Sequence, residues 1–280
     1  MLDTFLILPH PALSDYIYNY TICKSVSSYI NLTIPCFANH ETSLCFFLTD
    51  TPTLIKNCNT KNATKNIDKI SLFGLFTDSK GTMRFQGNCN EFIIEFKPNG
   101  FNNMFGIPAS KICDDIFPAN EVIGNCVKQF YEKLLYAEGV QEMVSLADKF
   151  LIGFLNKPKA AYMNEGITQI SNQISINPDT FNISQYARQA NMSIRNFERR
   201  FSEQVGTSPK LFCRLLRFNK AVKSKISHPK KSWCDIAFES GYYDNMHMIK
   251  DFKQFANASP AILFNDNPGL TEETLPHWNG

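Results

Sequence analysis

The feature that most constrains the fold of this chain is a motif that occurs twice in its last third, about 50 residues apart. The first copy reads Ala187-x3-Asn191-Met-Ser193-x3-Phe197-x3-Phe201-x7-Pro209, and the second reads Ala237-x3-Gly241-Tyr-Tyr-Asp244-x3-Met248-x3-Phe252-x7-Pro260. Repetition of one spacing indicates a supersecondary unit that the fold uses twice. The rest of the C-terminal region must therefore accommodate two similar units.

Each copy has the spacing of a helix-turn-helix. A small residue, Ala187 or Ala237, lets two helices approach closely. Four residues later, Asn191 or Gly241 can adopt the left-handed conformation that a tight turn between helices requires. A capping residue follows, and apolar residues four apart then place the next helix on a core. We therefore predict helices over residues 193–205 and 244–256, each following a tight turn.

The outward faces of these two helices carry side chains that suit a DNA major groove. Arginine and asparagine can read base edges through paired hydrogen bonds, glutamate can accept from cytosine, and apolar side chains can contact thymine methyl groups. The DNA-binding candidates are Arg195, Asn196, Glu198 and Arg199 on the first helix, and Asn245, Met246, His247, Ile249, Lys250 and Lys253 on the second.

The charge distribution agrees with this interpretation. The net charge of the 280-residue chain is only +2, but residues 164–264 hold 14 Lys and Arg against 8 Asp and Glu. The preceding residues are almost neutral and the last 16 are acidic. A basic stretch of about 100 residues that also carries two helix-turn-helix patterns is typical of a nucleic-acid-binding module.

Residues 180–264 resemble the DNA-binding domain of AraC/XylS-type transcription regulators. The residues that carry the resemblance are Ala187, Ser193, Arg199, Phe201, Gly206, Ser208-Pro209, Arg217 and Ala221, then Ile236-Ala237, Gly241-Tyr242, Asp244, Phe252-Lys253 and Ser259-Pro260. The resemblance implies two helix-turn-helix units joined by a rigid helix, which read successive major grooves of double-stranded DNA. It also implies RNA polymerase as a partner.

Three positions depart from the family pattern. Met248 stands where an aromatic residue or leucine is usual, Asn257 replaces the usual glycine, and Lys250 occupies a position where arginine is common. Asparagine also visits the left-handed region, so Asn257 is compatible with a helix end. A lysine offers a point charge instead of a planar fork, which weakens base selectivity at Lys250.

The N-terminal region has the pattern of a β domain. Short runs rich in Phe, Ile and Leu start at Ser43, Lys69 and Glu91, and residues 83–92 read as a hairpin with its turn at Gly87-Asn88. The segments Pro11-x-Leu13-x2-Tyr16 and Glu95-Phe-Lys-Pro98-x-Gly100-x4-Phe105-Gly resemble the sensor domains of some of these regulators, which implies a small β-barrel and a small-molecule effector.

The pattern changes to helical periodicity over residues 121–156. Two apolar stripes predict a helical hairpin, and we expect these stripes to pair two subunits into a homodimer. The expected fold class is α+β: an N-terminal antiparallel β-barrel or cupin-like domain, a helical hairpin, and an all-α domain with two helix-turn-helix units joined by a long helix. The expected boundaries are 1–120 for the sensor domain, 121–163 for the hairpin and linker, 164–267 for the DNA-binding domain and 268–280 for a flexible tail.

Other classes of function have less support in the sequence. Cys36-x3-His40-Glu41 could supply metal ligands, but no second cluster with ligand spacing follows, and the seven cysteines of the N-terminal region could form a redox sensor. No catalytic motif is present, so we expect neither an enzyme nor a cofactor. The N-terminus lacks the pattern of a signal peptide and no long apolar run occurs, so we expect a cytoplasmic protein that makes no contact with a membrane. Two alternatives stay open: a ligand-binding or metabolic protein with a nonspecific basic module, and an adapter without a ligand.

Overall fold

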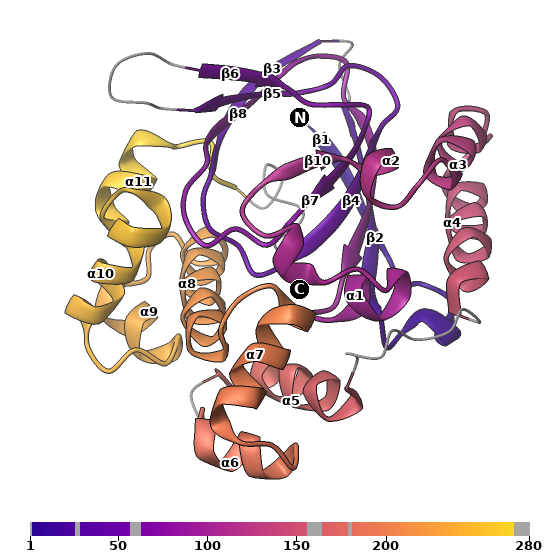
Figure 1. The fold of residues 1–280 in the computed structure, drawn as a ribbon. Helices are drawn as coiled ribbons and strands as arrows, with labels where there is room; N and C mark the ends of the chain where they lie inside the picture. The colour runs from indigo at the N-terminus through magenta and orange to yellow at the C-terminus, as the bar shows by residue number, and fades with distance from the viewer. Residues whose placement is uncertain (1, 26–28, 57–62, 156–163, 179–180, 272–280) are drawn as a thin grey trace.

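The computed structural model describes residues 2–25, 29–56, 63–155, 164–178 and 181–271. The N-terminal half forms two antiparallel sheets, and the C-terminal helices α5–α11 lie along one end of them (Figure 1). The strands are β1 (Leu2–Ile7), β2 (Ile17–Ser25), β3 (Ile30–Cys36), β4 (Thr42–Phe47), β5 (Thr53–Lys56), β6 (Ala63–Asn66), β7 (Ile70–Phe73), β8 (Gly81–Gly87), β9 (Asn90–Phe96) and β10 (Ile116–Pro118).

A helix lies between β9 and β10, and all the elements after β10 are helices. They are α1 (Gly100–Phe105), α2 (Ala119–Val122), α3 (Cys126–Leu135), α4 (Val140–Leu155), α5 (Glu165–Ile176), α6 (Ile183–Gln189), α7 (Ile194–Val205), α8 (Pro209–Ser227), α9 (Trp233–Glu239), α10 (Asn245–Ala256) and α11 (Pro260–Asp266). Short 3-10 turns occupy Pro11–Leu13 and Ala109–Lys111. None of the helices in the described segments is both long and apolar enough to span a bilayer.

The α+β fold class is confirmed, but the expected barrel is not closed. The strand order is β1-β2-β9-β4-β7-β10 in the larger sheet and β3-β8-β5-β6 in the smaller one, and no pairing between described strands joins the two sheets. The predicted hairpin around Gly87-Asn88 is wrong, because the strands before and after the turn belong to different sheets. The chain does turn there, with Gly87 at φ +111°, but β8 pairs with β3 and β5, whereas β9 pairs with β2 and β4.

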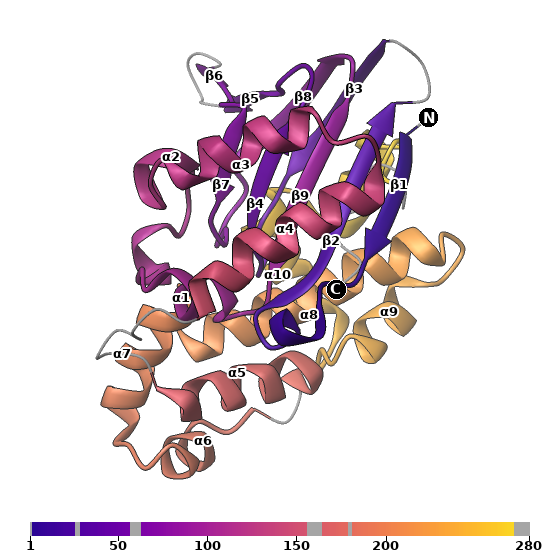
Figure 2. The ribbon, with the colours of Figure 1, turned by 90° about the vertical axis from the view of Figure 1, so that its right-hand side faces the viewer.

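The six-stranded sheet is covered on both faces. Helices α3 and α4 cross one face (Figure 2), where Phe46 packs edge-on against Phe130 with ring centroids 5.0 Å apart. The other face packs against the four-stranded sheet through residues such as Phe47, Ile93 and Met83. Because both faces are covered, β2, β4 and β9 are buried along most of their length, and their buried positions include the polar residues Thr21, Glu91 and Glu95.

The predicted helical hairpin corresponds to α3 and α4, but its apolar stripes face inward. Val127, Phe130 and Leu134 of α3 and Ala147 and Leu151 of α4 are buried in the core that these helices share with the six-stranded sheet. A second subunit would therefore have to contact the opposite, more polar side of the hairpin. The predicted linker at 157–163 and most of the predicted tail lie outside the described residues.

The N-terminal and C-terminal parts share one hydrophobic core. Phe37 and Ala38, just after β3, are buried among the C-terminal helices, and the Phe37 ring meets Phe218 of α8 edge-on at 5.7 Å. The backbone amide of Ala38 donates to the Phe255 carbonyl at 2.9 Å, and the side-chain amide of Asn219 donates to the Ala38 carbonyl at 3.0 Å. The segment between β3 and β4 is thus embedded in the helical region.

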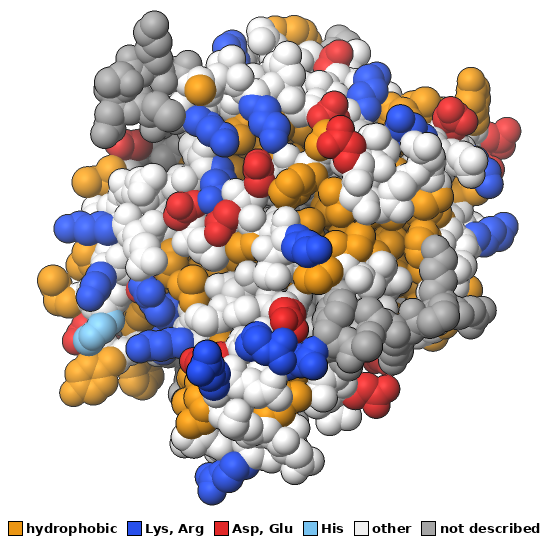
Figure 3. Space-filling view, in the orientation of Figure 1, with side chains coloured by type: hydrophobic (Ala, Val, Ile, Leu, Met, Phe, Trp, Pro, Cys, Tyr) orange, Lys and Arg blue, Asp and Glu red, His pale blue; other side chains and the backbone are white. Residues whose placement is uncertain are grey.

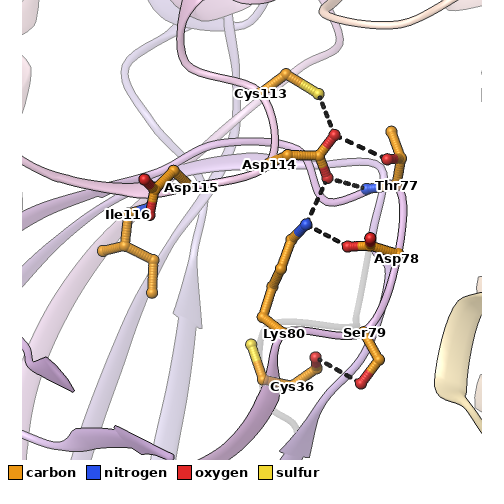
Figure 4. Close-up of polar contacts among 9 residues, drawn as sticks. All are labelled: Cys36, Thr77, Asp78, Ser79, Lys80, Cys113, Asp114, Asp115 and Ile116. Carbon is orange, nitrogen blue, oxygen red and sulfur yellow. Dashed lines mark hydrogen bonds and ion pairs between the residues drawn. The ribbon is translucent and has the colours of Figure 1, made fainter. Parts of the chain in front are cut away.

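A polar cluster supports the adjoining loops of the β region (Figure 4). Asp114, at φ +67°, accepts from the Thr77 amide at 2.7 Å and pairs with Lys80 at 2.8 Å. Lys80 also pairs with Asp78. The hydrogen bonds from Lys80 and Thr77 outweigh the effect of burial and lower the pKa of Asp114. This cluster fixes the turn after β7 against the segment before β10, beside the loop between α10 and α11.

His40 gives the shared core a testable pH dependence. Burial lowers its pKa to about 4, whereas an unfolded histidine titrates near 6.5. Its stabilising contribution is therefore fully present above pH 6.5 and is lost as the pH falls toward 4, up to about 3 kcal/mol. We expect the free energy of unfolding, measured with urea from pH 7 to 4.5, to fall more steeply for the wild type than for His40→Gln. Glu41, whose pKa is raised, has the opposite trend in both proteins. Parallel profiles would contradict the prediction.

Candidate nucleic-acid interface

The two interhelical turns are built with the same hydrogen bonds. The Met192 amide donates to the Ala187 carbonyl at 2.9 Å, and at the equivalent place the Tyr242 amide donates to the Ala237 carbonyl at 3.0 Å. Asn191 and Gly241 occupy the left-handed region at φ +54° and +78°. The predicted duplication of a helix-turn-helix is therefore present in the backbone geometry of both copies.

The helices that follow these turns begin and end alike. The Ser193 hydroxyl accepts from the Asn196 amide at 3.3 Å before α7, and the Asp244 carboxylate accepts from the His247 amide at 2.8 Å before α10. Gly206 and Asn257 follow the two helices at φ +103° and +56°. Asn257 thus adopts the left-handed conformation expected of it, although the family pattern has glycine there.

Helix α8 connects the two units rigidly. It contacts α7 at one end and α9 and α10 further along, and its inner face is buried in the common core. Arg214 of α8 pairs with Asp251 of α10 at 2.6 Å and lies over the Phe255 ring at 5.0 Å. Arg217 lies over the Tyr242 ring at 5.6 Å. These arginines hold the second unit on α8, and both are half-buried.

The first set of predicted DNA-binding residues lies on the outer side of α7. Arg195, Glu198 and Arg199 are exposed and Asn196 is half-buried. The Arg199 guanidinium donates to Glu203 Oε1 at 2.8 Å and to Asn196 Oδ1 at 2.9 Å, so its side chain is held along the helix surface. Phe197 and Phe201, on the opposite side, are fully buried.

The second set divides into exposed and partly covered residues. Met246, His247, Lys250 and Lys253 of α10 are exposed, and Met246 retains 70% of its accessible surface. The His247 ring lies 2.9 Å from the Asp244 carboxylate, whose pKa is lowered chiefly by the hydrogen bond from the His247 amide.

Asn245 and Ile249 are only half-exposed, and the Asn245 Oδ1 atom is buried without a hydrogen-bond partner. They are the least accessible of the second set. Two exposed aromatic residues beside this set were not predicted: Tyr243, 94% exposed, and Phe238, 83% exposed. Phe238 directly follows the buried pair Ile236-Ala237 on a short helix, which in the sequence would have indicated an outward position.

The surface over α7–α10 is rich in basic side chains. Lys and Arg gather at the lower left in Figure 3, beside exposed hydrophobic groups. The exposed basic residues of the C-terminal helices and their connections are Arg188, Arg195, Arg199, Lys210, Lys220, Lys230, Lys250 and Lys253. The geometry therefore combines two helix N-termini, two sets of outward polar side chains and a positive surface.

Burial and hydrogen bonding limit what the residues of the metal and thiol alternatives can do. Within the described ranges, no three His, Cys, Asp or Glu residues are arranged to hold a metal ion. His40 Nδ1 is engaged by Asn219 at 2.6 Å, and burial raises the pKa of Cys36 and of Cys113 to about 12. These two thiols stay protonated at neutral pH, which lowers their reactivity.

Two parts of the chain match known families. Residues 186–265 match a family described as a helix-turn-helix domain, and residues 6–118 match a domain of unknown function, DUF6597. The HTH-type transcriptional activators RhaS of Escherichia coli O139:H28 (strain E24377A / ETEC) and of strain SE11 are each 32% identical to this chain over 94 residues. Each match covers 34% of this chain and 34% of the relative, so the chain spans about a third of the curated relatives' length.

Two solved structures are similar to this chain at lower sequence identity than the curated relatives. The crystal structure of ToxT from Vibrio cholerae O395 is 11% identical, covers 94% of this chain and 96% of that chain, and has a TM-score of 0.46. The DNA-binding domain of AdpA, crystallised with a target DNA, is 20% identical, covers 37% of this chain and 94% of that chain, and has a TM-score of 0.34.

Gly241 provides a test of the second turn. Alanine at φ +78° is strained, so Gly241→Ala should lower the free energy of unfolding by about 1–2 kcal/mol, as measured by urea denaturation. Gly153 is the matched control, because it lies inside α4 and a methyl group added to it would meet no heavy atom of another element within 4 Å. Gly153→Ala should raise stability by about 0.5–1 kcal/mol. A Gly241→Ala protein as stable as the wild type would refute the turn geometry.

Proposed function

We propose, from the premise that residues 186–265 are an AraC/XylS-type helix-turn-helix domain, that this protein is a sequence-specific DNA-binding transcription regulator. The observation that carries the proposal is the pair of equivalent helices α7 and α10. Each is exposed on one side, each begins at a capped N-terminus, and α8 holds both in one body. This arrangement suits two helices that enter successive major grooves.

Roles for individual residues follow from exposure and chemistry. We assign base reading in one groove to Arg195, Glu198 and Arg199, which project from the exposed side of α7. In the next groove, Met246, His247 and Lys250 of α10 have the corresponding access, with smaller contributions from Asn196, Asn245 and Ile249. Lys253 lies one turn further along α10 and suits a phosphate contact, as do the backbone amides at the start of each helix.

Further partners belong to the same proposal. The relatives called transcriptional activators support RNA polymerase as a partner. We also propose that a small molecule controls DNA binding and that the protein forms a homodimer through the outer side of α3 and α4. Because a regulator acts where its DNA is, we assign the protein to the cytoplasm of a prokaryotic cell.

The competing function is a ligand-binding or metabolic protein whose basic helices bind DNA without regard to sequence. Selection of random duplex DNA by the full-length protein separates the two. We expect an enriched motif with two blocks about one helical turn apart, bound with a moderate salt dependence. Binding with a steep salt dependence and no enriched motif would refute the proposal in favour of the nonspecific module.

Arg199 tests base reading in the first block. Arg199→Ala should weaken binding to the selected site by about 1–3 kcal/mol and relax preference at one base pair, measured by titration against single-base variants of the site. The change removes two exposed contacts within α7, which contribute only a few tenths of a kcal/mol each to folding. An unchanged preference at every base pair would contradict this assignment.

Lys253→Ala is the matched substitution for a phosphate contact. It should weaken binding to the selected site and to random DNA equally, and reduce the slope of log affinity against log salt by about 1. A loss confined to the selected site would instead assign base reading to Lys253.

A further inference from the structure

A cavity lies at the junction of the β region and the DNA-binding helices, away from the exposed sides of α7 and α10. Its volume is about 280 Å³. Tyr18, His40 and Glu41 line it from the β region, and Asn219, Lys220 and Lys223 line it from α8. A cavity of this size fits a small metabolite instead of a drug-sized ligand.

Hydrogen bonds fix the orientation of the His40 ring. Asn219 donates its amide nitrogen to the Ala38 carbonyl at 3.0 Å, so its Oδ1 atom must face His40. That oxygen accepts from the His40 backbone amide at 3.2 Å and lies 2.6 Å from His40 Nδ1. Nδ1 therefore carries the proton of the neutral ring, and Nε2 is left as an acceptor.

Glu41 presents a second acceptor to the same space. Its side chain is only 7% exposed, and its Oε1 atom lies 3.6 Å from His40 Nε2. At 3.6 Å these two atoms are too far apart for a direct hydrogen bond, but one donor group can reach both at ordinary hydrogen-bond distances of about 2.9 Å. A primary ammonium, with three donors and a positive charge, has the required chemistry.

Helix α8 supplies positive charge to the cavity. Lys220 and Lys223 lie on α8, and Lys223 is close enough to influence the pKa of both His40 and Glu41. A ligand with an ammonium alone would meet these lysines unfavourably, whereas a carboxylate on the same molecule would be attracted to them. The cavity thus has acceptors for a cation from the β region and cations for an anion from α8.

We propose that this cavity binds a small zwitterion of the α-amino acid type, with its ammonium between Glu41 and His40 Nε2 and its carboxylate toward Lys220 and Lys223. A bound ligand would connect the β region to α8, the helix that joins both DNA-binding units. Its action as an effector rests on the proposed function, whereas its binding does not.

The ionisation of Glu41 adds a signature. Burial, and then the nearby charge of Glu95, raise the pKa of Glu41, while Lys223 opposes this effect. A bound ammonium favours the carboxylate, so binding should release a proton and strengthen as the pH rises. The other charged or titratable groups around Glu41 are Tyr18, His40, Glu95, Lys220 and Lys223.

The test measures ligand binding by the full-length protein without DNA, so it is independent of the outcome of DNA selection. The probes are the standard L-amino acids at millimolar concentration, screened by melting temperature and followed by titration calorimetry. We expect at least one to raise the melting temperature, and its decarboxylated amine and its deaminated acid to bind at least about tenfold more weakly. No shift with any probe, or equal binding of the amine or the acid, would overturn the proposal.

Variants locate the site. Glu41→Gln keeps the shape of the side chain and should weaken binding of the identified amino acid by at least about tenfold and abolish the proton release. Lys223→Met should weaken binding of the amino acid more than binding of its amine. Lys210→Met, an exposed change at the start of α8 and outside the cavity lining, should leave affinity unchanged. Unaltered affinity in a folded Glu41→Gln protein would overturn the proposed location.

Discussion

The burial of Phe37 and Ala38 among the C-terminal helices determines how the whole molecule is organised. A helix pair of a helix-turn-helix unit is too small to bury a core by itself, and α5, α8 and α10 close theirs partly with residues from the β region. The backbone hydrogen bond from Ala38 to Phe255 and the hydrogen bond from the Asn219 side chain to the Ala38 carbonyl make this contact directional as well as apolar. The orientation of the helix-turn-helix units is thereby linked to the strands that flank residue 38.

The two helix-turn-helix units have the same backbone geometry, but their surface chemistry differs. Their turns, caps and buried positions correspond almost residue for residue, because close packing allows few solutions. Their exposed sides do not correspond: α7 presents arginines and glutamate, whereas α10 presents methionine, histidine and lysines beside exposed Phe238 and Tyr243. In the proposed function, the two grooves would therefore be read by different kinds of contact.

Local patterns predicted the C-terminal region well. Ser193, Gly206, Asp244 and Asn257 define helix ends through interactions within a few residues, so their spacing is sufficient to place α7 and α10. The exposed sides of these helices followed from the same periodicity, apart from the partial burial of Asn196, Asn245 and Ile249. Which of the exposed residues contact DNA depends on a partner that periodicity does not describe.

Long-range pairing was harder to predict. The turn at Gly87-Asn88 looks like a hairpin locally, but the partners of β8 and β9 lie at least 27 residues away, so nothing nearby in the sequence distinguishes a hairpin from a crossing between sheets. The stripes of α3 and α4 posed a similar problem. An apolar stripe shows that a helix face is buried, but not whether a sheet of the same chain or a second subunit covers it. The cavity beside His40 depends on residues 18, 41 and 219 coming together, which no local pattern reveals.

The bracing of Arg199 has a consequence for how selectivity could arise. In the free protein its guanidinium already has two partners, Asn196 and Glu203, on its own helix. In the proposed function, a DNA base would therefore have to offer better geometry than these groups before the arginine turned toward it, and a base that offered less would leave the arginine where it is. Discrimination then resembles an exchange between competing acceptors, in which the helix itself sets the threshold that a correct base has to exceed.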